Sequence, residues 1–289
     1  DRDGGFDKPD IKAVLLAAGD IDPRRSEQCA QPFDLIALYA ADLRKKIKSG
    51  VNAADYDRPL SGLHVVLDAG NGAGGFFAEK VLLPLGADIS GSQFLEPDGT
   101  FPNHMPNPEN KAAMASVRAA TVQNSADLGI IFDTDVDRMS AVLPNGEEVN
   151  RDAIIAMMAA VLAPDYPGAT VVTDSVTSDR LTVFLEKELG LKHHRFKRGY
   201  KNVINEAIRL NKEGFVCPLA IETSGHGALS ENYFLDDGAY MAVKLLVAAA
   251  RAKAQGKRLG ALIEALPSAV EEKEVRIPIA GADFADTGR

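Results

Sequence analysis

Short apolar runs alternate with amphipathic stretches along most of the chain. From about residue 63, runs rich in Val, Ile and Leu that are typical of strands are followed by segments whose apolar residues recur at helical spacing. The same alternation begins again at about residue 150. We predict a hairpin at residues 141–149, around an Asn-Gly turn, and strands at residues 63–70, 87–93, 128–132, 168–174, 192–196 and 217–223.

The segments around these strands have helical periodicity or helix-start signals. We predict helices at residues 8–18, 33–50, 74–86, 107–125, 151–163, 177–190, 200–214 and 236–256. Residues 128–132, LGIIF, are apolar throughout, as expected of a strand that is buried on both faces. The pattern predicts an α/β fold with two tandem three-layer αβα domains on mixed, mostly parallel sheets.

The two series of elements set the predicted domain boundaries. We assign residues 33–150 to a first α/β domain and residues 151–265 to a second. Residues 1–32 have the pattern of the tail of a preceding domain and a linker, and residues 266–289 that of a linker toward a further domain. Ligands of such domains bind outside the carboxyl ends of strands, so we expect binding and catalytic residues in the loops that follow the strands.

Composition argues against several classes of function. The 289 residues carry a net charge of −9, which disfavours a large nucleic-acid interface because phosphate backbones attract clustered Lys and Arg. No apolar run reaches the ~18 residues needed to cross a bilayer, and no leader pattern is visible, so we expect no membrane partner. Two cysteines in the whole sequence suggest a cytoplasmic location.

Three aspartates follow the most apolar predicted strand at every second position. Asp133, Asp135 and Asp137 are followed directly by Arg138. Carboxylate oxygens are preferred ligands of Mg²⁺, and three such charges repel one another unless a cation joins them. An arginine can hold a phosphate with two parallel hydrogen bonds. The loop therefore predicts a Mg²⁺ site, and the alternative is a polar loop facing solvent.

Two other loops have weaker signals. Gly70, Gly72 and Gly75 fit the G-x-G-x-x-G pattern of dinucleotide-binding turns, but the acidic residue expected about 20 positions later does not end the next strand. A tight strand-to-helix turn explains them better. Residues 194–202, HRFKRGYKN, form the most basic stretch and suit either a solvated face or a phosphorylated substrate.

A glycine-rich loop follows the last predicted strand. In ETSGH, Glu222, Ser224 and His226 supply hydrogen-bond donors and acceptors that suit sugar hydroxyls, and glycines let the backbone approach a ligand. The alternative is a polar turn in which His226 is only packed. The proline-rich loop FPNHMPNP, residues 101–108, has no clear chemical assignment, and we expect a structural role for it.

Taken in order, DAGNG, FPNHMPNP, DTDVDR and ETSGH resemble the signature loops of the α-D-phosphohexomutases, the phosphoglucomutase and phosphomannomutase family. The resemblance extends over about residues 33–265 and includes spacing as well as motif. Members of this family have four domains. The resemblance therefore implies that residues 33–150 are the second, metal-binding domain and residues 151–265 the third, sugar-recognition domain, with the first and fourth domains of the same chain as missing partners.

The resemblance also implies roles for residues of the metal loop. That loop usually reads D-G-D-G-D-R in the family, so Asp133, Asp135 and Asp137 would bind Mg²⁺ and Arg138 would be catalytic. Residues other than glycine stand at positions 134 and 136, and we expect a stiffer turn.

The sugar-recognition loop of the family usually reads G-E-[MS]-S-G-H. Glu222, Ser224 and His226 match it as substrate-binding residues, whereas the first and third positions differ. Lys197 matches a lysine near the reacting sugar in parts of the family, and would act as an acid, a base or a charge partner.

The family's phosphoserine loop and the phosphate-binding loop of its fourth domain do not occur in this sequence. In the family, a phosphoserine and a hexose 1,6-bisphosphate intermediate interconvert hexose 1-phosphate and hexose 6-phosphate, with Mg²⁺ beside the phosphate. The expected function is thus that of a mutase segment that supplies the Mg²⁺ and sugar loops but does not turn over alone. Glucose, mannose and glucosamine phosphates are not distinguished.

Other functions stay open on the sequence. A HAD-type, Mg²⁺-dependent sugar-phosphate phosphatase would use Asp133 as nucleophile and Asp135 as acid and base, with later motifs at Thr173, Lys197 and Asp236-Asp237. Against it, these later motifs fall in the second strand-helix series. A non-catalytic sugar-phosphate binding module and a dinucleotide-binding domain are the remaining alternatives.

Overall fold

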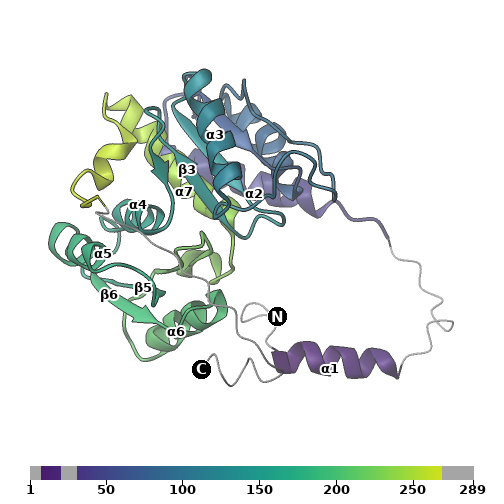
Figure 1. The fold of residues 1–289 in the computed structure, drawn as a ribbon, viewed down its shortest axis with the longest axis vertical. Helices are drawn as coiled ribbons and strands as arrows, with labels where there is room; N and C mark the ends of the chain where they lie inside the picture. Colours follow the sequence, from purple (N-terminus) through teal and green to yellow (C-terminus); the bar gives the residue numbers. More distant parts are fainter. Residues whose placement is uncertain (1–7, 21–30, 269–289) are drawn as a thin grey trace.

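The computed structural model describes residues 8–20 and 31–268, so parts of the predicted N-terminal tail and of the C-terminal linker lie outside the described residues. Helix α1 (Lys8–Gly19) forms where it is predicted, and none of its residues is buried. The rest of the described chain builds two sheets that are covered by helices (Figure 1). Within the described residues, no helix combines the length and the apolar character needed to cross a bilayer.

The first sheet has four strands in the order β1-β2-β3-β4. The β1–β2 pair is parallel, whereas the β2–β3 and β3–β4 pairs are antiparallel. All five residues of β2 are buried, as its apolar sequence predicts. The strands are β1 (Val65–Asp68), β2 (Leu128–Phe132), β3 (Met139–Val142) and β4 (Glu148–Val149).

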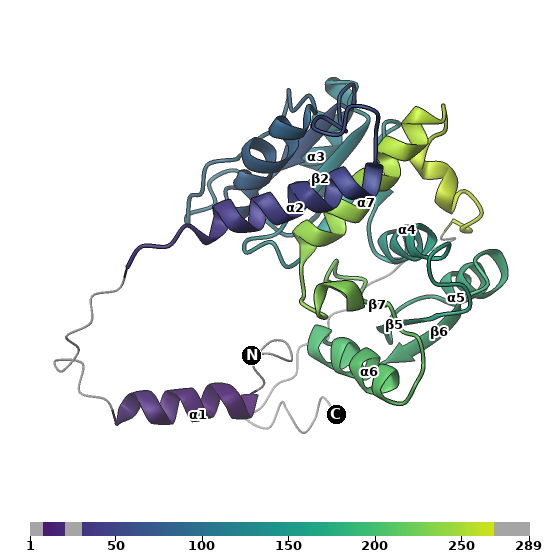
Figure 2. The same cartoon turned by 180° about the vertical axis from the view of Figure 1, so that it is seen from behind.

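Helices cover both faces of this sheet. Helix α3 (Lys111–Gln123) packs on one face, and Ile131 of β2 belongs to the same apolar cluster as its buried residues. Helix α7 (Gly238–Ala254) contacts β2 and β3 and lies beside α2 (Leu35–Val51), as Figure 2 shows. Helix α7 comes from the end of the second series, so the two halves of the chain share one large core.

Two predicted elements of the first half are wrong in detail. Residues 73–85 do not form a regular helix but three short segments, a 3₁₀ turn at Ala73–Gly75, a π turn at Ala78–Leu82 and a 3₁₀ turn at Leu83–Leu85. Pro84 lacks an amide hydrogen for a regular turn, and any side chain at Gly75 would clash with the Leu95 carbonyl. The strand predicted at 87–93 is reduced to two isolated bridges.

The second sheet has the order β6-β5-β7-β8. The β5–β6 and β5–β7 pairs are parallel and the β7–β8 pair is antiparallel, so both sheets are mixed, as predicted, and three of the six strand pairs are parallel. The strands are β5 (Thr170–Asp174), β6 (Lys192–Phe196), β7 (Leu219–Ile221) and β8 (Gly227–Leu229). Strand β8, which is three residues long, is not among the strands predicted from the sequence.

The helices of the second half join the two sheets. Helix α6 (Tyr200–Lys212) packs on β5 and β7. Helix α5 (Asp179–Val183) continues into a π turn at Phe184–Glu188. Helix α4 (Asp152–Leu162) is almost completely buried and contacts α7 and β4, which places it between the two sheets (Figure 1). A short 3₁₀ segment, Leu259–Ile263, packs against α4.

Candidate active site

Strand β2 runs directly into the metal loop, which we define as residues 133–138. Asp133 is fully buried, and its two carboxylate oxygens accept hydrogen bonds from Arg138: Oδ1 from the backbone N–H at 3.0 Å and Oδ2 from Nε at 2.9 Å. The remaining guanidinium group reaches Asn107, whose Oδ1 accepts from Nη1 at 3.4 Å. The loop is therefore closed by its own first and last residues, which fixes the direction of Arg138.

The three aspartates of the loop converge. One oxygen from each of Asp133, Asp135 and Asp137 lies within 4.8 Å of the others. Oδ1 of Asp137 is buried and has no hydrogen-bond partner among the described residues. Buried carboxylate oxygens normally have a partner, and a hard cation with oxygen ligands would supply one here. The donor set therefore fits Mg²⁺.

The pKa of Asp133 is also consistent with a cation in this loop. Burial raises the pKa of Asp133 to about 6, and the neighbouring carboxylate of Asp137 adds to the effect. The hydrogen bond from the backbone of Arg138 opposes this rise. A bound divalent cation would favour the ionised carboxylates, because it is the largest local charge in such a site.

The structure explains how valine occupies a family glycine position. Val136 has φ = 70°, in the left-handed region that favours glycine, and its carbonyl accepts the N–H of Gly238 at 2.9 Å. A strained backbone of this kind costs about 1–3 kcal/mol. The side chain is 9% exposed and belongs to the main core, so its burial offsets part of this strain. The turn is thus compatible with valine, at the price of strain.

The glycine loop after β1 packs against the metal loop. A Cβ at Gly72 would lie 2.8 Å from the carbonyl oxygen of Thr134, and that oxygen accepts the N–H of Ala73 at 2.9 Å. Gly70 has φ = 53°, and a Cβ there would lie 2.6 Å from Cβ of Pro106. These glycines are required by close approach of other segments, in agreement with the predicted tight turn.

The proline-rich loop has a function in positioning that the sequence does not reveal. Nε2 of His104 lies 3.0 Å from both carboxylate oxygens of Asp68, the last residue of β1. Asp68 is fully buried, and it also accepts hydrogen bonds from the N–H of Gly70 and from Nε2 of Gln93. The histidine therefore ties the loop 101–108 to the end of the first sheet.

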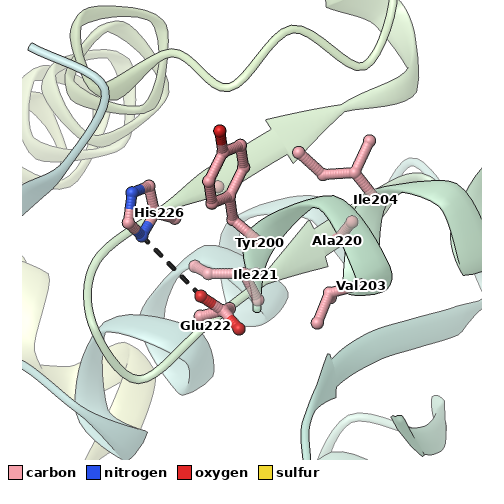
Figure 3. Close-up of a pocket in the computed structure, with 8 residues that line it drawn as sticks. Tyr200, Val203, Ile204, Ala220, Ile221, Glu222 and His226 are labelled. Atoms are coloured by element: carbon pink, nitrogen blue, oxygen red, sulfur yellow. Dashed lines mark ion pairs between the residues drawn. The ribbon is translucent and has the colours of Figure 1, made fainter. Parts of the chain in front are cut away.

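The sugar loop, residues 222–226, brings its three predicted residues together, and Figure 3 shows the pairing of Glu222 with His226. Nδ1 of His226 lies 2.9 Å from Oγ of Ser224 and 3.7 Å from Oε2 of Glu222. The imidazole stacks on the ring of Tyr200 with 4.9 Å between ring centroids. Burial raises the pKa of Glu222, although the Gly199 N–H that its Oε1 accepts at 2.6 Å opposes the rise.

The sugar loop also docks on the metal loop. Gly225 has φ = 96°, its carbonyl accepts the N–H of Met139 at 3.1 Å, and a Cβ on it would lie 2.8 Å from the Met139 carbonyl oxygen. Nε2 of His226 lies 3.5 Å from Oδ2 of Asp137. The two loops, which are almost 90 residues apart in sequence, thus form a single surface.

The contact between His226 and Asp137 shifts the pKa values of both side chains. Burial lowers the pKa of His226, but the hydrogen bond to Asp137 and the charge of Asp236 outweigh it, so the net shift is upward. Burial raises the pKa of Asp137, but the hydrogen bond with His226 outweighs it and the net shift is downward. A protonated imidazole beside an ionised carboxylate is therefore the favoured state of the pair.

Lys197 is placed near this surface without touching it. The residue is exposed in the loop between β6 and α6, and it makes no hydrogen bond or ion pair within the described residues. Two residues later, the backbone N–H of Gly199 donates a hydrogen bond to the Glu222 carboxylate. The predicted site residues therefore form one group, except that Asp135 is exposed at the edge and Lys197 stands apart.

Sequence reasoning missed the contribution of Asp236 as a site residue. Its side chain is 11% exposed, its Oδ1 accepts the N–H of Gly227 at 3.0 Å, and Oδ2 lies 3.9 Å from Nε2 of His226. Burial raises the pKa of Asp236 to about 7. Two adjacent aspartates before a helix are the signal that was available.

The arrangement expected of a HAD-type phosphatase is not formed. Asp133 follows β2 in the first sheet, whereas Thr173 lies in β5 of the second sheet and bonds His193 at 2.7 Å. Asp133, the nucleophile in that alternative, accepts a hydrogen bond from Arg138 at each carboxylate oxygen.

Two family models match most of the chain. The model of phosphoglucomutase/phosphomannomutase alpha/beta/alpha domain II matches residues 37–146, and the model of domain III matches residues 150–270. The chain belongs to the phosphoglucomutase/phosphomannomutase family. Only residues 147–149, which include β4, separate the two matched ranges.

Individual relatives agree with this family membership. A phosphomannomutase/phosphoglucomutase of Pseudomonas syringae is 34% identical over 75% of this chain and 45% of its own length. A phosphoglucomutase of Neisseria meningitidis is 32% identical over 84% of this chain and 54% of its own length. The chain thus spans about half the length of these curated relatives.

Solved structures show the same fold. A phosphoglucomutase/phosphomannomutase family protein from Burkholderia thailandensis superposes with a TM-score of 0.70 at 28% identity, over 92% of this chain and 54% of that one. A putative phosphomannomutase from Thermus thermophilus gives a TM-score of 0.68 at 20% identity, over 91% of this chain and 57% of that one. At 20% identity, the similarity to the Thermus thermophilus protein is evidence for the fold only.

Proposed function

We propose that residues 33–265 are the metal-binding and sugar-recognition part of a phosphohexomutase that interconverts hexose 1-phosphate and hexose 6-phosphate. A phosphoserine of a first domain transfers its phosphoryl group to the hexose phosphate, which forms a hexose 1,6-bisphosphate, and the serine then takes back the other phosphoryl group. A fourth domain completes the site. The low cysteine content keeps the cytoplasm as the proposed location. Family membership and the half-length coverage of relatives support this proposal.

One observation carries the proposal. The sugar loop docks on the metal loop through the Met139–Gly225 backbone hydrogen bond at 3.1 Å and the His226–Asp137 contact at 3.5 Å. A sugar bound at the first loop therefore lies beside the carboxylates of the second. In phosphoryl transfer, catalysis depends chiefly on positioning and on stabilisation of charge, which two adjoining loops of this kind provide.

Each residue has a proposed role. Asp133, Asp135 and Asp137 hold Mg²⁺, which when bound neutralises charge on the transferring phosphoryl group. Arg138 is held by Asp133 through Nε, so that its remaining nitrogens can contact phosphate oxygens.

On the sugar side, Glu222, Ser224 and His226 bind hexose hydroxyls. Lys197, which is exposed in the β6–α6 loop, serves as the acid, base or charge partner of the substrate. Because Glu222 already holds Gly199, occupancy of the sugar loop is linked to the position of the loop that carries Lys197.

Binding measured on this chain tests the proposal. We would titrate the chain with Mg²⁺ and then with glucose 1-phosphate and mannose 1-phosphate, following backbone amide signals by NMR. The expected result is Mg²⁺-dependent shifts at residues 133–138 and sugar-dependent shifts at residues 222–226. Asp135→Asn should move the first set to about tenfold higher Mg²⁺ concentrations, and Glu222→Gln should abolish the second set. Asp165→Asn, a change at an exposed residue outside both loops, should alter neither set. Sugar phosphates that shift neither loop would refute the proposal.

A further inference from the structure

Asp236 has a buried oxygen that no other group uses. Oδ2 is buried and lacks a hydrogen-bond partner among the described residues, and it lies 3.9 Å from Nε2 of His226. A buried, unsatisfied acceptor is unfavourable by about 1–3 kcal/mol, so such atoms call for an explanation. The nearby imidazole N–H is a donor that a small movement would bring within hydrogen-bond distance.

Two contacts hold the imidazole of His226 in addition to those at Nε2. Its Nδ1 is engaged by Ser224 at 2.9 Å, and one ring face stacks on Tyr200. Its Nε2 lies 3.5 Å from Oδ2 of Asp137. The orientation of the imidazole therefore depends on a carboxylate at Nε2.

Asp137 is shared between two groups, because it contacts His226 and the proposed function also assigns it to the cation. It belongs to two overlapping groups of ligand atoms, one with Asp133 and Asp135 and one with His226 and Asp236. The protonated imidazole of His226 and a divalent cation are both attracted by the negative charge of this carboxylate. When Mg²⁺ binds Oδ1 of Asp137, less of the negative charge of that carboxylate is left for His226 at Oδ2. The unpartnered Oδ2 of Asp236 is then the second carboxylate oxygen near Nε2 of His226.

Asp236 itself is firmly anchored. Its Oδ1 accepts the N–H of Gly227 at 3.0 Å, which fixes the carboxylate to the residue after His226. The next residue, Asp237, caps α7 by accepting the N–H of Tyr240 at 2.8 Å and also accepts the Tyr39 hydroxyl at 2.6 Å. The carboxylate is thus fixed by α7, which is itself packed on the first sheet.

We propose that Asp236 is a positioning residue that holds His226 in place when Mg²⁺ engages Asp137. This inference rests on the proposed function, because it assumes the metal role of Asp137. In this arrangement the cation and the histidine do not compete, and the sugar loop keeps its shape whether or not metal is bound.

The test uses Mg²⁺ alone as the probe and the His226 ring as the readout. The variant is Asp236→Asn, which keeps an oxygen for the Gly227 N–H but can present a donor to Nε2. The matched control is Asp152→Asn, a buried aspartate of α4 that contacts Ser178 and Arg180 and bonds no residue of either loop. NMR records the contacts between ring protons of His226 and Tyr200, and calorimetry records Mg²⁺ affinity.

In the wild-type chain and in D152N, we expect the His226–Tyr200 contacts to persist after Mg²⁺ is added. In D236N they should persist without Mg²⁺ and weaken with it, and Mg²⁺ should bind about fivefold more weakly, because coupling between two sites is reciprocal. In a His226→Gln background, D236N should change Mg²⁺ affinity less than twofold, since the competing group is gone.

Each outcome has one meaning. A wild-type chain that does not bind Mg²⁺ overturns the proposed function, and this inference with it. Wild-type binding together with unchanged His226–Tyr200 contacts in Mg²⁺-loaded D236N overturns this inference alone. A D236N effect of equal size with and without His226 shows a general charge effect and also overturns it. If D236N does not fold, Asp236→Ser, which keeps a hydroxyl, is measured under the same criteria.

Discussion

Gly225 joins the sugar loop to the metal loop, and its replacement by alanine tests that contact directly. The residue has φ = 96°, and an added Cβ would lie 2.8 Å from the backbone carbonyl oxygen of Met139. The carbonyl belongs to β3 and cannot rotate away as the end of a flexible side chain could. The methyl group must therefore strain the loop or push it away from the first sheet.

The magnitude follows from two separate effects. A left-handed backbone is unfavourable for a residue other than glycine by about 1–2 kcal/mol. Forcing a methyl group into a closely packed position adds about 1–3 kcal/mol. The sum, about 2–5 kcal/mol, lowers the midpoint of thermal unfolding by roughly 5–15 °C for a folded unit of this size.

Gly168→Ala is a matched control for the first effect. Gly168 also has a positive φ, 71°, but no described atom lies within 4 Å of the position of its Cβ. We expect it to lower the free energy of unfolding by only about 1–2 kcal/mol. Circular dichroism during urea and thermal unfolding gives both values. If Gly225→Ala is no more destabilising than Gly168→Ala, the close contact between the loops does not exist as described.

Three other predictions follow from single side chains. His104→Ala removes a partner of the fully buried Asp68 and should lower the free energy of unfolding by about 1–3 kcal/mol in urea; a loss below 0.5 kcal/mol would contradict the role of the pair. Asp135→Asn should weaken Mg²⁺ binding about tenfold in calorimetry with little loss of stability, because Asp135 is exposed. Burial lowers the pKa of His193 to about 4, whereas the imidazole in the unfolded chain keeps its ordinary pKa of about 6.5. Between these pH values the unfolded chain binds a proton that the folded chain does not, so the free energy of unfolding falls as the pH drops from 6.5 to 4. In His193→Gln, urea unfolding should show a fall over this pH range that is smaller by about 1–2 kcal/mol, a value reduced because the imidazole is partly exposed to solvent; an unchanged pH profile would contradict it.

Local patterns predicted the parts of the fold that depend on short segments. Strand β2 and helix α6 form where apolar runs and helical spacing place them. The convergence of Asp133, Asp135 and Asp137 could be anticipated because three carboxylates in five residues are a chemical signal in themselves. The irregular turns at 73–85 were missed because contacts with Leu95, distant in sequence, override helical periodicity.

Contacts between distant residues account for what the sequence could not predict. The His104–Asp68 pair joins positions 36 residues apart, and the Tyr39–Asp237 hydrogen bond joins positions 198 apart. Helix α7 has the periodicity of any amphipathic helix, so nothing local indicates that it packs beside α2 on the first sheet. Asp236 gains its proposed role only from the approach of His226 and Asp137.

The most direct test of the central claim is the ³¹P NMR spectrum of glucose 1-phosphate with Mg²⁺ and an equimolar amount of this chain. It is recorded before and after a phosphoserine-bearing first domain from a relative is added. Our account predicts a shifted or broadened signal without turnover for the chain alone, and glucose 6-phosphate once the phosphoserine is supplied. Inorganic phosphate released by the chain alone would contradict the account and favour Asp133 as a phosphatase nucleophile.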